Sequence, residues 1–181
     1  MIEKKNVLVI IGSASSNSAN QKLVDCFADL CKDDFALTIY NDLKTLPHFD
    51  PELSTDNAPT LVQEFRNAVD KADGILICTP EYVFSIPSGL KNAIEWCVST
   101  TVFSDKPVGI ITASADGRKG HEELQLIMKT IMSKFTESTT LLIRGIKGKI
   151  NEMGEITDSK TLDDLTRFVT EYKTLIKNAS H

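Results

Sequence analysis

Five short apolar stretches alternate with segments of helical periodicity along this chain, and that alternation limits the folds open to it. The five stretches are residues 7–11, 35–40, 74–79, 107–114 and 139–144. The first is rich in β-branched residues and apolar throughout, as expected of a strand buried on both faces of a parallel sheet. Strands that alternate with helices form a parallel sheet covered on both faces. We therefore predict a three-layer αβα, doubly wound α/β fold with strand order 2-1-3-4-5.

The chain length and charge narrow the class of protein further. A length of 181 residues suits one domain, and no linker or repeat divides the sequence, so we expect residues 1–181 to form a single domain. The net charge is −5 and the basic residues are scattered, which argues against a nucleic-acid partner. The apolar run that begins at Val7 is too short for a signal peptide or a membrane span. We expect a cytoplasmic protein with no membrane partner.

The cysteines are expected to be reduced thiols in the core. The four are Cys26, Cys31, Cys78 and Cys97. None is paired in a C-x-x-C motif, and each lies in a predicted helix or strand among apolar neighbours. A metal site or redox thiol is a minority interpretation, and no metal is expected.

Residues 12–20, with the sequence GSASSNSAN, connect the first predicted strand to a helix. The start of a helix offers unpaired N–H groups and a partial positive charge, and nearby hydroxyl groups complete an anion site. The candidates are Ser13, Ser15, Ser16, Ser18 and Asn20. Because Gly12 is the only glycine, neither the P-loop nor the dinucleotide fingerprint fits, and a site for a terminal phosphate monoester is predicted. The alternative is one serine cap among loop residues without a ligand.

The predicted strand order places this loop beside a second unusual segment. The topological switch lies between the first and third strands, and ligands bind there, outside the carboxyl ends of the strands. The loops that follow Ile11 and Thr79 should therefore meet.

Three other segments are expected to be structural. Residues 41–58 are polar with two prolines and should form an irregular excursion, in which His48 is a surface or packing residue. Residues 149–157 resemble a short hairpin or an extended flap around Met153 and Gly154, and Asp158 is a plausible cap for a final packed helix.

The segment 79–96 begins with a turn that Pro80 and Pro87 stiffen. A rigid turn holds backbone N–H and C=O groups in fixed positions, which suits a flat heterocycle, and Tyr82 and Phe84 would add wall surface. The alternative is a structural turn with its aromatic side chains packed in the core, and for this segment taken alone it is the better explanation.

Together, GSASSNSAN, PEYVFSIPSGLKNAIEW and SADGRKG closely resemble the NADPH-dependent FMN reductase family, and the similarity runs nearly end to end. The resemblance implies a flavodoxin-like fold, FMN as cofactor and NADPH or NADH as co-substrate. It also implies a small-molecule electron acceptor, such as a quinone, azo compound, chromate or free flavin. A homodimer or homotetramer is expected on the same ground.

The resemblance also implies which residues contact the cofactor. For the phosphate they are Ser13, Ser18 and Asn20, with the backbone amides of neighbours such as Ser15 and Ala19. For the ribityl chain and the isoalloxazine ring they are Pro80, Glu81, Tyr82, Val83, Phe84 and Ser85, with Ser114, Asp116 and Gly117 on the other side of the ring.

The chain departs from the family pattern at three places. Ser15 stands where an arginine is common, Val83 where asparagine is frequent, and Lys119 and Gly120 where the family has paired glycines. The first change removes a charge-assisted phosphate contact. As a hypothesis, Arg118 and Lys119 attract the phosphates of a nicotinamide dinucleotide; a solvated loop is the alternative.

The implied chemistry is hydride transfer from the nicotinamide through FMN to the acceptor at one shared site, which predicts ping-pong kinetics. No side chain need act as acid or base, so no catalytic residue is assigned. One alternative is a flavodoxin-type electron carrier that passes single electrons to a protein. Another is a non-enzymatic relative that has lost the flavin.

Overall fold

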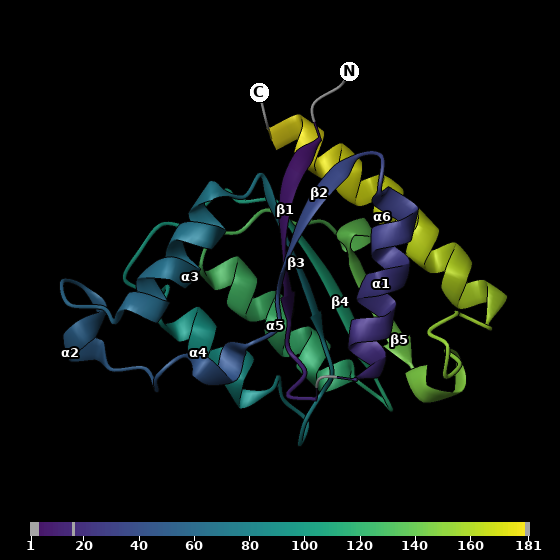
Figure 1. The fold of residues 1–181 in the computed structure, drawn as a ribbon, viewed down its shortest axis with the longest axis horizontal. Coiled ribbons are helices and arrows are strands. Elements are labelled where there is room, and N and C mark those ends of the chain that lie inside the picture. The colour runs from purple at the N-terminus through teal and green to yellow at the C-terminus, as the bar shows by residue number, and fades with distance from the viewer. Residues whose placement is uncertain (1–3, 16, 180–181) are drawn as a thin grey trace.

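The computed structural model describes residues 4–15 and 17–179, and its centre is a five-stranded parallel sheet (Figure 1). The strands are β1 (Lys5–Ile11), β2 (Phe35–Tyr40), β3 (Gly74–Thr79), β4 (Val108–Ser114) and β5 (Thr140–Arg144). Their order is β2-β1-β3-β4-β5, and every neighbouring pair is parallel. The predicted doubly wound fold and strand order are confirmed.

Helices cover both faces of the sheet. They are α1 (Ala19–Cys31), α2 (Pro51–Ser54), α3 (Thr60–Lys71), α4 (Ser88–Glu95), α5 (Arg118–Thr130) and α6 (Ser159–Ala179). The 3₁₀ turns among the described residues are η1 (Leu43–Thr45), η2 (Glu137–Thr139) and η3 (Ile146–Gly148). Helices α1 and α6 lie on one face and α3, α4 and α5 on the other (Figure 1). No helix in the described part of the chain is long and apolar enough to span a membrane.

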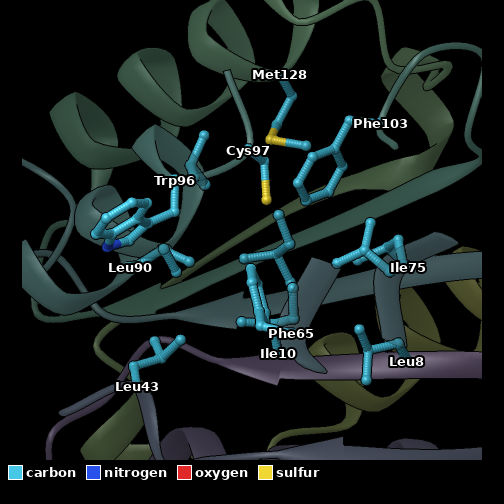
Figure 2. Packing of buried hydrophobic residues seen from close by; sticks show 14 of the residues in the cluster. Leu8, Ile10, Leu43, Phe65, Ile75, Leu90, Trp96, Cys97, Phe103 and Met128 are labelled. Carbon is cyan, nitrogen blue, oxygen red and sulfur yellow. The ribbon is translucent and has the colours of Figure 1, made fainter. Parts of the chain in front are cut away.

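Strand β1 shows why its sequence is apolar without alternation. Leu8 and Ile10 belong to the core beneath α3, α4 and α5, which also contains Phe65 and Met128 (Figure 2). Val9, the residue between them, packs instead in the core beneath α1 and α6. Because both faces are buried, successive side chains must all be apolar.

The first and third strands end together, as predicted. Ile11 pairs with Cys78 in the parallel register, and the Gly12 N–H donates to the Cys78 carbonyl at 2.9 Å. A Cβ atom at Gly12 would lie 2.7 Å from the Thr79 Cβ, so only glycine fits this close approach. The loops after β1 and β3 therefore start from neighbouring points at the carboxyl edge of the sheet.

Residues 41–58 are more regular than predicted, because they contain η1 and α2. Asp50 caps α2 by accepting the Glu52 N–H at 2.9 Å, and Pro51 occupies the first turn, where its missing N–H has no cost. Residues 149–157 form a turn closed by an antiparallel bridge between Ile150 and Ile156, consistent with the predicted hairpin.

The cysteines are free thiols, as predicted. Cys31, Cys78 and Cys97 are buried, and Cys26 is half-buried. Burial raises the pKa of Cys31 and of Cys97 to about 12, so both stay protonated near neutral pH.

Candidate functional site

The serines of residues 12–20, which we call the first loop, differ in their contacts and burial. Ser18 is the N-cap of α1 and accepts the Gln21 N–H at 3.1 Å. Ser13 is buried; its Oγ accepts the Ser15 N–H at 3.3 Å and lies 3.5 Å from the Tyr82 hydroxyl. Ser15 is exposed, and Ser16 lies outside the described residues. One serine accounts for the helix cap, which leaves the Ser13 and Ser15 hydroxyl groups at the mouth of the loop.

Asn20 directs its side chain into the protein rather than toward the loop. It is buried, its Nδ2 donates to the Ala113 carbonyl at 3.2 Å, and its Oδ1 accepts from the Cys78 thiol at 3.4 Å. The side chain therefore joins α1 to the ends of β3 and β4. The backbone N–H groups of Ala19 and Asn20, in the first turn of α1, have no intrahelical acceptor. A phosphate contact from Asn20 would come from this backbone group.

The second loop contains a tight turn with an unusual backbone. Tyr82 and Ser85 exchange both backbone hydrogen bonds, at 2.9 and 3.0 Å. The two residues between them have positive φ angles, 51° for Val83 and 60° for Phe84, as in a type I′ turn. Such positions normally carry glycine or asparagine, because a Cβ branch crowds the left-handed conformation. Hence the asparagine that is frequent in the family at position 83 suits this turn better than valine does.

The tip of this turn is an exposed apolar surface. Val83 is 94% exposed, Phe84 75% and Tyr82 43%. The interpretation in which these aromatic side chains pack in the core is therefore wrong. We call these three residues the apolar tip.

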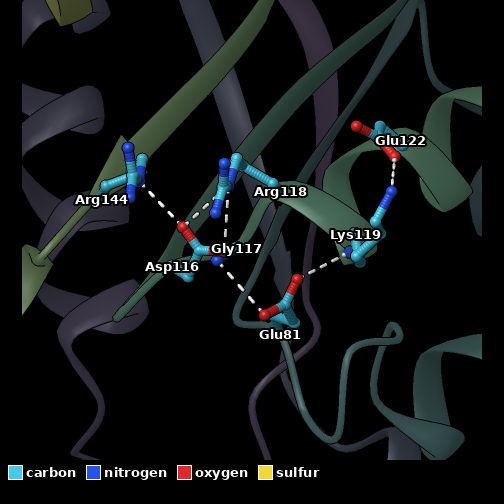
Figure 3. A network of polar contacts seen from close by, with 8 residues as sticks. Glu81, Asp116, Gly117, Arg118, Lys119, Glu122 and Arg144 are labelled. Carbon is cyan, nitrogen blue, oxygen red and sulfur yellow. Dashed lines mark hydrogen bonds and ion pairs between the residues drawn. The ribbon is translucent and has the colours of Figure 1, made fainter.

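Two carboxylates tie the second loop to α5. Glu81 accepts the Gly117 N–H at 3.3 Å and the Gly120 N–H at 2.8 Å, so its carboxylate occupies the N-terminus of α5 (Figure 3). In the opposite direction, Glu123 of α5 accepts the Ser85 hydroxyl at 2.7 Å and the Ile86 N–H at 3.0 Å. The turn is consequently held in place from both ends.

The loop between β4 and α5, which we call the third loop, lies in a small network of ion pairs (Figure 3). Asp116 pairs with Arg118 at 3.0 Å and with Arg144 at 2.9 Å, and the hydrogen bond from Arg118 is the main cause of its lowered pKa. Lys119 pairs with Glu122 at 2.8 Å. Both cations of the dinucleotide hypothesis thus already have a carboxylate partner, which reduces their attraction for a phosphate.

Ser114 and Gly117 complete the third loop. The Ser114 hydroxyl donates to the Glu81 carbonyl at 3.4 Å, and Gly117 caps α5 with a φ of 85°. The second and third loops are therefore in direct contact through Glu81.

A cavity of about 630 Å³ opens on the other side of the first loop. Its lining includes Ser13, Ser15 and Tyr82 but none of the third-loop residues. The remaining wall comes from the start of α4 and from the segment after β2, which contributes Asn41, Asp42, Leu43, Lys44, Leu46 and His48. None of these residues is among those predicted for the site from the sequence. The available signal was the strand order, which places β2 next to β1 and hence the end of β2 next to the first loop.

Residues 5–141 match the model of a family described as NADPH-dependent FMN reductase. The chain belongs to this family. Its cofactor is accordingly FMN and its electron donor NAD(P)H, and it is an oxidoreductase.

Individual relatives agree with this assignment. The chain is 30% identical to an NADH:(hydroxy)cinnamate reductase subunit CrdA of Vibrio ruber over 174 aligned residues. The alignment covers 92% of this chain and 85% of that protein. It is 27% identical to a quinone reductase of Escherichia coli over 98% of both chains. Among solved structures, FerB, a flavoenzyme NAD(P)H:(acceptor) oxidoreductase from Paracoccus denitrificans, matches with a TM-score of 0.78 and 24% identity, over 96% of this chain and 98% of that one. The last match shows the shared flavodoxin-like fold.

Proposed function

We propose that this protein reduces a small acceptor of the quinone type with electrons from NADPH or NADH, with FMN held by the three loops at the carboxyl edge of the sheet. The observation that carries the proposal is the meeting of the first loop with the turn after β3, where Ser13 Oγ lies 3.5 Å from the Tyr82 hydroxyl. The relative from Escherichia coli is named a quinone reductase, which supports this class of acceptor.

The first loop offers a donor set that fits the phosphate of FMN. The donors are the exposed Ser15, the hydroxyl of Ser13 and the first backbone N–H groups of α1, which have no acceptor within the helix. Hydroxyl and backbone donors at a helix start suit a phosphate monoester. We propose Ser13, Ser15, Ser18, Ala19 and Asn20 as its contacts, with Asn20 acting through its backbone.

The second and third loops would hold the ring. The proposed contacts are Pro80, Glu81, Tyr82, Val83, Phe84, Ser85, Ser114, Asp116 and Gly117. When bound, FMN supplies the acceptance and donation of hydride. The Glu81 and Glu123 carboxylates keep the backbone of the apolar tip in a fixed position. Because FMN carries the chemistry, no side chain of the chain is required as a general acid or base.

The proposal is tested by titrating the purified protein with FMN and then measuring oxidation of NADPH and of NADH with a simple benzoquinone as acceptor. Quinone-dependent turnover by the protein alone, with parallel double-reciprocal lines, is expected. Turnover that needs a second protein would favour an electron carrier instead. Absence of FMN binding would refute the assignment of the loops.

Oligomeric state and location also belong to the proposal. We expect a homodimer or homotetramer, which the exposed apolar tip supports because a second copy could cover it. The free thiols favour the reducing cytoplasm. Light scattering coupled to size-exclusion chromatography measures the oligomeric state, and a monomer at micromolar concentration would contradict the expected homodimer or homotetramer.

A further inference from the structure

The positive charge in the lining of the cavity comes from the segment after β2, which also contributes the carboxylate of Asp42. Among the described residues that line it, Lys44 is the one lysine or arginine, and it faces the same space as Ser13 and Ser15. The two serines offer hydroxyl groups without charge. A phosphate monoester carries close to two negative charges at neutral pH, so a cation near it adds a stronger, charge-assisted contact.

The backbone at Lys44 is held firmly against α4. Lys44 lies in η1 between Leu43 and Leu46, both of which are buried. The backbone carbonyl of Pro47, the residue after Leu46, accepts hydrogen bonds from Asn92 Nδ2 at 2.9 Å and from Trp96 Nε1 at 2.8 Å. The position from which the lysine side chain starts is therefore fixed before any ligand binds.

The side chain of Lys44, by contrast, has little to hold it. It is 82% exposed, and among the described residues the one carboxylate within ion-pair distance is that of Asp42, at 3.8 Å. An exposed ion pair of this kind contributes little free energy. The Lys44 ammonium group can therefore leave Asp42 and bind a phosphate with little loss of free energy. Lys22 at the start of α1 differs, because its Nζ already donates to the carbonyls of Asn151 and Glu152 at 3.3 and 3.1 Å.

We propose that Lys44 provides the positive charge for the FMN phosphate held by residues 13–15. The inference rests on the proposed function, since it assumes that FMN binds at this loop. It assigns a cofactor contact to the segment after β2, outside the three loops at which the site was expected.

The test is a titration monitored by flavin fluorescence, with FMN and with riboflavin, which lacks the phosphate. We expect Lys44→Gln to raise the dissociation constant for FMN about tenfold, the size of one hydrogen bond to a charged group. The riboflavin constant should stay unchanged, and Lys44→Arg should restore most of the FMN affinity. The matched control is Lys129→Gln, which makes the same charge change at an exposed lysine near the end of α5.

The outcomes separate this inference from the proposed function. If wild-type protein binds FMN and Lys44→Gln binds it equally well, the inference is overturned and the function stands. An equal loss for FMN and riboflavin, or a change confined to the Michaelis constant for NADPH, would also overturn it. No FMN binding by wild-type protein would overturn both. Thermal melting of each variant shows whether the fold is intact.

Discussion

Replacing Val83 with asparagine should stabilise this protein, although the change puts a polar side chain in place of an apolar one. Val83 has a φ of 51° and is 94% exposed. A left-handed backbone costs a residue with a side chain about 1–2 kcal/mol, and asparagine tolerates it better than a β-branched residue. Since the valine side chain makes almost no packing contact, little is lost in return. We expect a gain of about 1 kcal/mol in the free energy of unfolding.

The gain is measurable by urea and thermal unfolding of the ligand-free protein, followed by circular dichroism. For a chain of this size, 1 kcal/mol corresponds to a rise in melting temperature of about 2–4 °C. The matched control is Val98→Asn, because Val98 is also an exposed valine but does not have a positive φ. A change within about 0.5 kcal/mol is expected there. If Val83→Asn is no more stable than the wild type, the reasoning from backbone strain is refuted.

Three further predictions concern stability. Gly12→Ala should destabilise the protein by about 1–3 kcal/mol in urea unfolding, because its Cβ would lie 2.7 Å from that of Thr79; an unchanged midpoint would contradict the close approach. Tyr172→Phe should raise stability by about 1 kcal/mol, since the buried Tyr172 hydroxyl has no hydrogen-bond partner in the described part of the chain, whereas Trp96→Phe breaks a hydrogen bond of 2.8 Å and should lower it. Lower stability of Tyr172→Phe would refute this. Burial lowers the pKa of His121 below 6.5, so the unfolded chain binds the proton more readily and stability falls as the pH drops below 6.5. His121→Gln should flatten the pH dependence of the unfolding free energy between pH 6.5 and the folded-state pKa, and an unaltered slope would exclude His121 as its cause.

The fold was predictable because a strand whose two faces are both buried needs apolar residues at successive positions, and that pattern is visible in the sequence. Residues 7–11 are apolar throughout, and neighbours such as Ile10 and Ile11 do pack into different cores. The strand order then placed the loops after Ile11 and Thr79 together, which the Gly12 to Cys78 hydrogen bond confirms. The apolar pattern of each strand and the expected strand order were enough to predict the sheet and the meeting of the two loops.

The details of the candidate site depended on tertiary contacts that no local pattern encodes. The positive φ of Val83 could not be foreseen, since valine normally avoids that conformation. The inward direction of Asn20 depends on a carbonyl of β4, far away in the sequence. Lys44 joins the cavity wall because Asn92 and Trp96 hold the following residues against α4. A pattern within one segment contains no information about such partners.

The crossed carboxylate contacts of Glu81 and Glu123 have a consequence for how this protein can evolve. Both contacts lie at the base of the turn, and neither involves the side chains at its tip. Residues 83 and 84 can therefore change in size and polarity without releasing the turn from α5. Substitution at these two positions would change the exposed surface of the turn, while the scaffold that positions them stays the same.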